Sequence, residues 1–399
     1  MTNLYIGVMS GTSLDGIDIS LCEISDSDCK LLAFDSYPFE LKDEVLNIIN
    51  NEVHISKIGE LDHKLGAMYA KHINEFIDTH NIQNSEIKAI GLHGQTLWHE
   101  PTKHFSMQLG DANIVAYATG IAVVSDVRRA DMAAGGQGAP FAPAFHSFLF
   151  GGEKTAVVNI GGMANVSILG EKIIGYDTGC GNVLLDSWIE KCQNKSYDKN
   201  GEWARSGKLD EALLAEFLSD EYFAKSHPKS TGREYFNLAW IEGKLSSHSE
   251  FISESKSNEI LKQVQHDKQD EIPKQVQHDE QNEIQKQVLH DKQVQADTQR
   301  TLLELTAKSI AIEIAKFDIN RVVLCGGGTK NIFLIERLKA LLPKSDILIS
   351  DELGVSSDAM ESMMMAWLGF MRIQKREVNL QDVTGASVNR ILGGLYEPN

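Results

Sequence analysis

The sequence predicts an α/β protein built from two domains. Its 399 residues are more than a single hydrophobic core usually serves. Short apolar runs typical of strands alternate with segments of helical periodicity along most of the chain. Each half also opens with two strands joined by a loop of small residues, which suggests a duplicated architecture. We expect a first domain at residues 1–126 plus about 372–399, and a second at 127–371 with an insertion at about 255–300.

The first half of the chain alternates between the two kinds of element. Runs of apolar and β-branched residues predict strands, and apolar residues recurring three or four positions apart predict helices. The expected strands are residues 4–9, 17–24, 31–39, 87–92 and 121–125. The expected helices are residues 42–49, 58–77 and 111–119, and a long glycine-rich loop follows Ser125.

The second half begins in the same manner as the first. Its expected strands are residues 155–160, 166–169, 173–176, 322–325 and 346–349. A helix is then expected, because Val183, Leu184, Trp188 and Cys192 lie on one helical face. Further helices are expected at residues 302–317, 332–342 and 358–371. The alternation favours an α/β fold for this half as well.

A polar repeat interrupts the second half at residues 262–300. The sequence KQVQHD stands at 262–267 and 274–279, and KQVLHD at 286–291, which gives a period of twelve residues. The segment is rich in Gln, Lys, Asp and Glu and almost free of aromatic residues, so it has little to pack. Metal binding by its histidines is one interpretation, but a surface insertion is the simpler one, because loop-closure entropy grows slowly with length. These histidines are His266, His278 and His290.

The acidic composition limits the class of partner. The formal net charge is −18, which argues against non-specific binding of nucleic acid or anionic membranes, because both depend on basic patches. It does not oppose phosphate binding, since backbone N–H groups and one or two local cations can hold phosphates. Net charge is therefore a weak guide to the substrate, but we expect neither nucleic acid nor membrane as a partner.

Cysteine usage and the N-terminus indicate the compartment. Five cysteines are scattered along the chain without a CxxC pair, which fits a reducing compartment with neither a disulfide framework nor a zinc site. Cys180 lies in a glycine-rich motif, but no neighbouring histidine supports a catalytic thiol there. The first residues, MTNLYIGVMSGTS, lack the features of a signal peptide, and no apolar run reaches 18 residues. We expect a cytoplasmic protein.

The motif GTSLDGID has the composition of a phosphate-binding loop, because small residues let the backbone approach phosphate oxygens while hydroxyls and amides donate to them. It stands between two strands, whereas a Walker A loop leads into a helix and ends in GK[ST], so a P-loop and a Rossmann GxGxxG are both excluded. Asp15 and Asp18 offer the oxygen ligands that Mg²⁺ favours. A plain hairpin turn is the alternative. The candidate phosphate-binding residues are Gly11, Thr12, Ser13, Leu14, Asp15, Gly16, Ile17 and Asp18.

Glycine-rich loops recur in the second half. NIGGMAN stands at a hairpin tip, where Gly161 and Gly162 permit close backbone approach and Asn165 offers an amide. The triplet Gly326–Gly328 follows a buried strand and suggests a flat group lying against the backbone, such as an adenine ring. A strand-end turn is the alternative for the triplet. The candidate ATP-binding residues in these loops are Asn159, Gly161, Gly162, Asn165, Gly326, Gly327, Gly328 and Asn331.

The motif DTGCGN combines a carboxylate with glycines. Asp177 is expected directly after a strand and before a helix, at the carboxyl edge of the sheet. The helix N-terminus and the glycine amides would favour phosphate, and a carboxylate aimed into a cleft accepts a proton from an attacking hydroxyl or water. Capping of the helix by Asp177 is the alternative. The neighbouring candidates for phosphate binding are Gly179, Gly181 and Asn182.

Taken in order, these motifs resemble the anhydro-N-acetylmuramic acid kinase family of the actin/hexokinase/Hsp70 ATPase superfamily. The resemblance runs from residue 7 to beyond residue 370 and covers nearly the whole chain apart from the repeat. It is carried by GVMSGTSLDGID, GLHGQTLWHEP, QLGDANIVAYATG, RADMAAGGQGAPFAPAFH, NIGGMANVS, DTGCGNVLLD, KSTGREYFN, GGGTKN and SSDAMESMMMAWL. It implies two ribonuclease-H-like (actin-like ATPase) domains with the active site in the cleft between them, and a homodimer.

The resemblance implies an ATP-dependent kinase that opens the 1,6-anhydro ring of anhydro-N-acetylmuramic acid with water and phosphorylates O6, giving N-acetylmuramic acid 6-phosphate and ADP in peptidoglycan recycling. Carried over, Asp177 would activate the water, and the glycine loops with Mg²⁺ would neutralise the transferring phosphoryl group. The family loop usually reads DTGPGN, so Cys180 replaces a proline, which loosens the loop slightly. The alternatives are a related sugar hydroxyl kinase and an actin- or Hsp70-like ATPase.

Polar segments between the loops would hold the sugar. An aromatic side chain such as Trp98 can stack on a pyranose, while Glu100 can hydrogen-bond to it. Arg128 or Arg129 could pair with the lactyl carboxylate, which suits a guanidinium fork. Lys229, like Arg233 in the same segment, is a candidate charge partner or a structural residue. The candidate substrate-binding residues are His93, Gln95, Trp98, Arg128, Arg129, Gln137, Gly138 and Glu361, the last with solvent exposure on a helix as the alternative.

Overall fold

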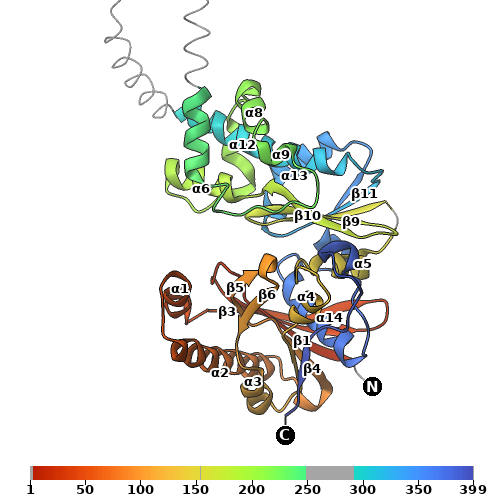
Figure 1. Cartoon of the computed structure of the whole chain (residues 1–399). Coiled ribbons are helices and arrows are strands. Elements are labelled where there is room, and N and C mark those ends of the chain that lie inside the picture. Colours follow the sequence, from red (N-terminus) through yellow and green to blue (C-terminus); the bar gives the residue numbers. More distant parts are fainter. Residues whose placement is uncertain (1–2, 153, 249–291, 399) are drawn as a thin grey trace, which may run out of the picture. The chain divides into compact units, whose positions relative to one another are not determined.

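The computed structural model describes residues 3–152, 154–248 and 292–398 (Figure 1). The chain divides into two compact units. Unit 1 comprises Met1–Val157, Ser167–Gly175 and Leu348–Asn399, and unit 2 comprises Val158–Val166 and Tyr176–Ile347. Residues 127–157 and 348–371 belong to unit 1 in this division, and the helix that ends the chain's α/β pattern packs on the first sheet. The domain bounds suggested by the sequence remain a prediction.

Unit 1 contains a six-stranded sheet in the order β13-β7-β4-β1-β2-β3. Its strands are β1 (Leu4–Met9), β2 (Ile17–Ile24), β3 (Cys29–Tyr37), β4 (Ile87–Leu92), β7 (Val123–Ser125) and β13 (Gly394–Tyr396). The hairpins β1–β2 and β2–β3 are antiparallel, whereas β4 runs parallel to β1 and β7 runs parallel to β4. Met9 pairs with Asp18, so the candidate phosphate loop closes the first hairpin and Asp18 stands at its end.

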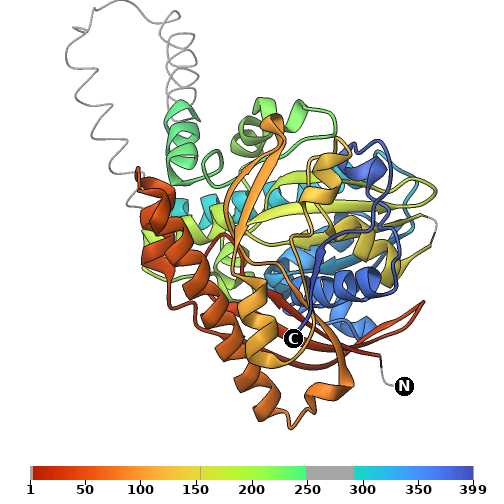
Figure 2. The same ribbon diagram turned by 60° about the horizontal axis from the view of Figure 1, so that its bottom comes forward.

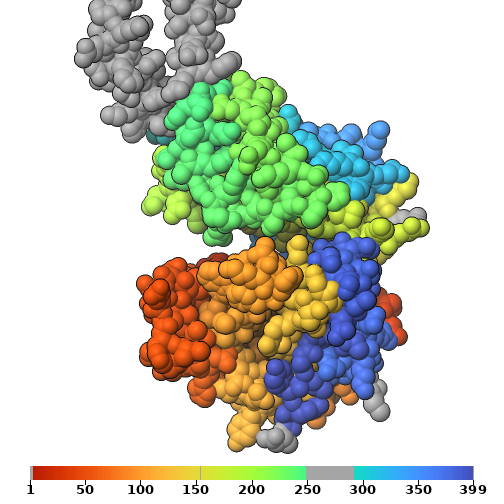
Figure 3. Space-filling model, viewed as in Figure 1, coloured from red at the N-terminus to blue at the C-terminus, as the bar shows by residue number. Residues whose placement is uncertain are grey.

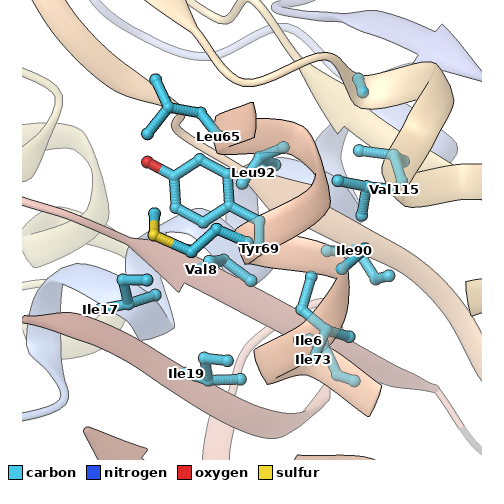
Figure 4. Close-up of a cluster of buried hydrophobic side chains, with 14 of the residues drawn as sticks. Ile6, Val8, Ile17, Ile19, Leu65, Tyr69, Ile73, Ile90, Leu92 and Val115 are labelled. Atoms are coloured by element: carbon cyan, nitrogen blue, oxygen red, sulfur yellow. The ribbon is translucent and has the colours of Figure 1, made fainter. Parts of the chain in front are cut away.

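The core of unit 1 follows from the alternation of side chains along β1. Ile6 and Val8 belong to a cluster of buried residues that joins the sheet to two helices (Figure 4). On the opposite face of the sheet, a Cβ on Gly7 would overlap the backbone of Ser362, and one on Gly91 would overlap Met365. Glycine is therefore required at both positions for the helix α14 to lie on the sheet.

Helices cover both faces of this sheet. α2 and α3 pack side by side (Figures 1 and 2), and α14 packs against β1, β4 and β2. Asp111 caps α3 by accepting a hydrogen bond from the Asn113 amide, and Gly120 ends this helix in a left-handed conformation. The helices of unit 1 are α1 (Lys42–Asn50), α2 (Ile55–Thr79), α3 (Ala112–Thr119), α4 (Arg129–Ala133), α5 (Ala142–Phe150), α14 (Met360–Ile373) and α15 (Gln381–Thr384). A separate hairpin is formed by β5 (Gln95–Glu100) and β6 (Phe105–Leu109).

A second sheet, most of whose residues lie in unit 2, has the order β10-β9-β8-β11-β12. This order repeats that of β3-β2-β1-β4-β7 in the first sheet, and it is the order of a ribonuclease-H-like domain. The predicted fold class, α/β with two such sheets, is confirmed. The strands are β8 (Thr155–Ile160), β9 (Met163–Leu169), β10 (Ile174–Cys180), β11 (Arg321–Cys325) and β12 (Asp346–Ile349).

The helices of unit 2 pack around one long buried helix, α12, which contacts α6, α7, α8 and α13. They include α6 (Val183–Gln193), α7 (Glu202–Ser206), α8 (Glu211–Leu218), α9 (Glu221–Ala224), α12 (Lys292–Ile314) and α13 (Ile332–Leu341), and residues 238–248 are helical as well. Residues 200–248, in green, form much of the face of unit 2 that Figure 3 shows. The 3₁₀ turns in the described part of the chain are Asn84–Glu86, Pro101–Lys103, Lys199–Gly201, Gly327–Lys330 and Ser350–Leu353. None of the helices within the described residues is long and apolar enough to cross a membrane.

Two expectations about the chain are corrected. The polar insertion was expected to extend to residue 300, but residues 292–300 form the first turns of α12, where Gln299 and Thr301 are fully buried. The strand before the helix α6 was expected to end at Tyr176, but β10 continues to Cys180 and includes Asp177. The three repeat histidines and the repeat motifs at 262–291 lie outside the described residues.

Candidate active site

The loop between β1 and β2 exposes small polar side chains over an apolar anchor. Thr12 and Ser13 are exposed, whereas Leu14 is buried and takes a left-handed conformation with φ of 56°. The Leu14 amide donates to the Gly11 carbonyl at 3.3 Å and closes a tight turn. Gly16 has little room for a side chain, because a Cβ there would lie 3.1 Å from Ser36 and Tyr37. The turn thus presents hydroxyls and backbone to solvent, as a phosphate loop requires.

The two carboxylates of this loop occupy different surroundings. Asp15 is exposed and lies 3.3 Å from the Lys42 ammonium. Burial raises the pKa of Asp18, with a smaller contribution in the same direction from Asp358, while a hydrogen bond from Ser36 opposes it. Asp18 is therefore the better placed of the two to take up a cation, because a cation would relieve the burial of its negative charge.

Glu361, in the first turn of α14, belongs to the same acidic neighbourhood. Its side chain retains solvent exposure, yet the protein atoms around it raise its pKa by desolvation. The Asp18 carboxylate raises the pKa of Glu361 further, and the Arg128 guanidinium lowers it. The Glu361 and Asp18 carboxylates thus repel each other electrostatically, although sequence reasoning placed them in separate sites.

His93 is held in one tautomer by its two partners. Its Nδ1 lies 2.7 Å from the Gly94 carbonyl, and its Nε2 lies 2.8 Å from a nitrogen of Arg128. A carbonyl only accepts and a guanidinium only donates, so Nδ1 carries the proton and Nε2 accepts. Burial, with Arg128 adding to it, lowers the pKa of His93 to about 3. The imidazole is therefore neutral and serves to orient Arg128.

Arg128 is fixed on three sides but keeps unused donor capacity. Its guanidinium donates to the Gly138 carbonyl at 2.8 Å and lies 5.3 Å from the centre of the Phe141 ring. Its buried Nε has no hydrogen-bond partner within the described part of the chain. Desolvation lowers the pKa of Arg128 to about 10, and Glu361 opposes the shift. Arg128 remains a preorganised cation at neutral pH.

Gln95 connects this group to the phosphate loop. Its Nε2 donates to the carbonyls of Gly11 at 3.4 Å and Thr96 at 3.3 Å. Both partners are acceptors, so the orientation of the amide is fixed, and Oε1 is left buried without a partner among the described residues. Burying an acceptor without a hydrogen-bond partner costs free energy. Gln95 and Arg128 are therefore candidates for hydrogen bonding to a ligand.

Trp98, Arg129 and Gln137, the other sugar candidates, have different surroundings. Trp98 is 49% exposed on β5, opposite Met107. Arg129 pairs with Asp126 at 2.7 Å and lines a separate cavity of about 600 Å³ beside β6 and the start of α3. The side chain of Gln137 is exposed. The structure therefore brings Arg128, and not Arg129, together with His93.

The glycine turn at residues 135–138 is held by a carboxylate that sequence reasoning missed. Asp131 is 1% exposed and accepts hydrogen bonds from the Gly138 amide and the Thr384 hydroxyl, both at 2.8 Å. Gly136 lies so close to Asp131 that a Cβ would overlap its carboxylate. An acidic residue two positions before a run of small residues, in RADMAAGGQG, was the available signal.

Asp177 lies on β10, the edge strand of the second sheet, with a one-sided clamp on its carboxylate. Its Oδ2 accepts hydrogen bonds from the Ser230 hydroxyl and the Thr231 amide, both at 3.0 Å. Among the described residues, Oδ1 accepts none. Burial raises the pKa of Asp177, and the two hydrogen bonds oppose that shift. One oxygen thus holds the rotamer and the other is available as a base.

The loops NIGGMAN and DTGCGN bind each other through their backbones. The amides of Gly181 and Asn182 donate to the carbonyls of Gly162 and Gly161 at 2.9 and 2.8 Å. The expectation that these amides receive phosphate is therefore corrected, since both are already used inside the protein. Gly181 permits this approach, because a Cβ there would overlap the Gly161 carbonyl. Asn165 lies half-buried on β9.

Arg233 and Asp186 lie beside this pair of loops. A Cβ on Gly162 would stand 3.6 Å from two nitrogens of the Arg233 guanidinium, so Arg233 lies over the loop. Asp186, in the first turn of α6, was missed by sequence reasoning. Its pKa is raised to about 6 by burial and, to a lesser degree, by Asp198, while Arg233 opposes the shift. These contacts place the Arg233 guanidinium, a cation, at the NIGGMAN loop.

The glycine triplet has one open member. Cβ atoms on Gly326 and Gly328 would overlap Asn159 and Ile160 at the end of β8, so these two glycines serve close packing. At Gly327 a Cβ would meet nothing within 4 Å, so a flat group could lie there. Asn331 caps α13 by accepting from the Leu334 amide at 3.0 Å.

Cys180 is not a nucleophile in this geometry. It is fully buried at the end of β10, and burial raises the pKa of its thiol to about 12. A thiol with such a pKa carries almost no thiolate at neutral pH. Within the described residues, no group of three or more His, Cys, Asp or Glu side chains is arranged to hold a metal ion.

The family model and the curated relatives that match this chain carry the same description. The family model "Anhydro-N-acetylmuramic acid kinase" matches residues 3–290 and 277–398. Curated relatives of that name are 49% identical in Sulfurimonas denitrificans, over 100% of both chains, and 47% identical in Sulfurovum sp., over 98% of both. Among solved structures, the activator of the 2-hydroxyisocaproyl-CoA dehydratase from Clostridium difficile with bound ADPNP aligns with 11% identity and a TM-score of 0.41, over 93% of this chain and 96% of that one.

Proposed function

The chain belongs to the anhydro-N-acetylmuramic acid kinase family, and we propose that Asp177 is the general base of its reaction. The protein is an ATP-dependent sugar kinase. It opens the 1,6-anhydro ring of anhydro-N-acetylmuramic acid with water and phosphorylates O6, giving N-acetylmuramic acid 6-phosphate and ADP. The related sugar hydroxyl kinase and the actin- or Hsp70-like ATPase are not favoured, because the relatives that match over the full chain carry this kinase name.

The one-sided clamp on Asp177 is the observation that supports its role. A general base needs a fixed oxygen within hydrogen-bond reach of the water it deprotonates. Ser230 and Thr231 fix Oδ2, which leaves Oδ1 for the water. Burial makes the carboxylate more basic, and proton transfer to a more basic group is more favourable. In the proposed step, Oδ1 takes a proton from water as the water oxygen attacks the anomeric carbon, and the C1–O6 bond breaks to leave O6 as the phosphoryl acceptor.

The transferring phosphoryl group carries negative charge that the site must neutralise. We place the phosphates of ATP against the loop from Gly11 to Gly16, whose exposed hydroxyls and backbone fit them. Asp18 would hold Mg²⁺, with Glu361 beside it, and the ion would neutralise charge on the transferring phosphoryl group. Arg233, whose guanidinium lies over the NIGGMAN loop, is a further candidate cation for phosphate binding.

Arg128 is the proposed partner of the lactyl carboxylate of the sugar. His93, Phe141 and the Gly138 carbonyl hold the guanidinium in place, so little freedom is lost when a carboxylate binds. The unpaired Oε1 of Gln95 would accept from a sugar hydroxyl or the N-acetyl amide. We also propose that the enzyme acts in the cytoplasm, in peptidoglycan recycling, as a homodimer.

The test of the reaction is mass spectrometry of the sugar product. The protein is incubated with Mg-ATP and anhydro-N-acetylmuramic acid in water enriched in oxygen-18. The expected product has gained one phosphoryl group and one water, with the label at the anomeric carbon. A gain of a phosphoryl group alone would contradict the role of Asp177 in activating water, and consumption of ATP without a sugar product would contradict the kinase.

A further inference from the structure

Lys229 is a cation almost wholly removed from water. Its side chain is 3% exposed and pairs at 2.7 Å with Glu313 of α12, which is 2% exposed. Glu313 also accepts a hydrogen bond from the Tyr176 hydroxyl at 3.1 Å and pairs with Lys316. Burial alone would raise the pKa of Glu313, but the hydrogen bonds from the two lysines outweigh it and lower that pKa. The Glu313 carboxylate is therefore stabilised in its ionised form.

Stability alone is a weak reason for such a pair. Removing two charges from water costs several kcal/mol per ion, and apolar residues of similar volume often do as well or better. The sequence analysis left Lys229 open as a partner for a substrate charge. The structure excludes that role, because its ammonium is buried against Glu313 and over the Tyr222 ring, 4.9 Å from the ring centre.

The position of Lys229 in the chain gives the pair a specific target. Its backbone carbonyl accepts from the Asp177 amide at 3.1 Å, and the next two residues supply both hydrogen bonds to the Asp177 carboxylate. The segment 229–231 belongs to no helix or strand, so side-chain contacts add to these few hydrogen bonds in setting its position. The ring of His227, just before it, stacks on Tyr176 with centroids 5.1 Å apart.

We propose that the Lys229–Glu313 pair is a positioning device that fixes segment 229–231 on β10 and thereby holds the Asp177 carboxylate in its working rotamer. The proposal rests on the proposed role of Asp177 as the base. Lys229 touches neither the substrate nor the reacting atoms in this assignment. Its ammonium is attached to α12 on one side, and its backbone is attached to Asp177 on the other.

The groups around Asp177 decide what loss of the pair does. Tyr222 of α9 donates to the Asp177 carbonyl at 2.8 Å, and its own pKa is raised by burial and by Asp177, Glu313 and Cys180. The carboxylate itself is bound by Ser230 and Thr231. If segment 229–231 moves away, burial acts on Asp177 without these two bonds, and its pKa rises. A base with a higher pKa is protonated, and inactive, at a higher pH.

The test compares Lys229→Met with the double variant Lys229→Met/Glu313→Gln. The double variant replaces the ion pair by neutral groups of similar length and avoids leaving one charge buried alone. Lys308→Met is the matched control, since Lys308 lies on α12, the helix that carries Glu313, and its ion pair within the described residues is with the exposed Glu211 at 3.7 Å. We expect kcat to fall about 10- to 100-fold in the first two variants, as for a misplaced catalytic group, with the KM for ATP within about twofold of wild type.

Two further readouts separate positioning from general destabilisation. The acid limb of the pH profile of kcat/KM should move to higher pH in the variants, and Lys229→Arg should restore it in part. Hydrogen exchange of the peptide covering residues 222–236 should rise in Lys229→Met, because the Thr231 amide loses its acceptor. A folded variant with wild-type exchange and an unmoved acid limb would overturn the proposal.

Failure of the underlying function would look different. If Asp177→Asn kept wild-type activity, the base assignment would fall, while faster exchange at residues 222–236 in Lys229→Met would still establish that the pair fixes the segment. If Asp177→Asn were inactive but the Lys229 variants behaved like Lys308→Met, the base would stand and the positioning role would be refuted.

Discussion

Replacement of Asp177 by Asn changes the charge of the proposed base while keeping its shape. The amide oxygen can take the place of Oδ2, so Ser230 and Thr231 keep an acceptor. Each of these bonds weakens from charge-assisted to neutral, by about 1 kcal/mol, and the smaller desolvation of an amide offsets part of that loss. We expect a change in the free energy of unfolding of about 1 kcal/mol or less, set against a loss in turnover of about 10²–10⁴-fold.

The magnitudes separate the two effects. A 10²–10⁴-fold loss corresponds to about 2.7–5.5 kcal/mol in the activation free energy, more than the change in folding. ADP release with anhydro-N-acetylmuramic acid measures turnover, calorimetry measures ATP binding, and chemical denaturation measures stability. Ser230→Ala is the control, since it keeps the carboxylate and the Thr231 amide and should lose less than about tenfold. Wild-type turnover in Asp177→Asn, with ATP binding and stability unchanged, would refute the reasoning.

Three other predictions follow from the same structure. Arg128→Lys should raise the KM for the sugar about 10-fold or more with little change for ATP, whereas Arg129→Lys, whose guanidinium pairs with Asp126, should not; equal effects in steady-state kinetics would contradict the assignment. The pKa of His93 is lowered to about 3 in the folded chain, below the ordinary 6.5 of the unfolded chain. The free energy of unfolding should therefore fall by up to about 1.4 kcal/mol per pH unit as the pH decreases from about 6.5. Chemical denaturation at pH 7.5 and 5 should show a smaller fall for His93→Gln than for the wild type. Deletion of residues 262–285, two whole repeats, should leave kcat and KM unchanged, and a soluble but inactive product would show that the insertion matters.

Five strands that the apolar runs predicted have the expected bounds. β1, β2, β4, β8 and β12 begin and end where the apolar runs do. Two helices, α4 and α5, lie where the sequence predicted only a glycine-rich loop after Ser125. α4 is only five residues long, and α5 (APAFHSFLF) is apolar on nearly every side, so neither shows a helical stripe. The hairpin β5–β6 carries exposed Trp98 and Met107 opposite each other, a pattern that alternation toward a core does not describe.

The candidate site was predictable in its residue types and not in its pairings. Arg128 and Arg129 are neighbours in the sequence, and only the folded chain turns one toward His93 and the other toward Asp126. Asp131 and Thr384 are 253 positions apart, and no local pattern relates them. Burial, which raises the pKa of Asp177 and lowers that of His93, likewise depends on atoms supplied by distant segments.

The cysteine in DTGCGN illustrates how the fold changes a local prediction. Without the usual proline the loop was expected to be looser, because the unfolded chain has more conformations to lose. In the structure, the Thr306 hydroxyl of α12 donates to the Gly181 carbonyl at 2.9 Å and lies 4.0 Å from the Cys180 sulfur. The Gly181 amide is held by the Gly162 carbonyl. Residues outside the loop thus hold it on both faces. α12 orders this loop through Thr306, and it orders segment 229–231 through Glu313, whereas the local sequence would order neither.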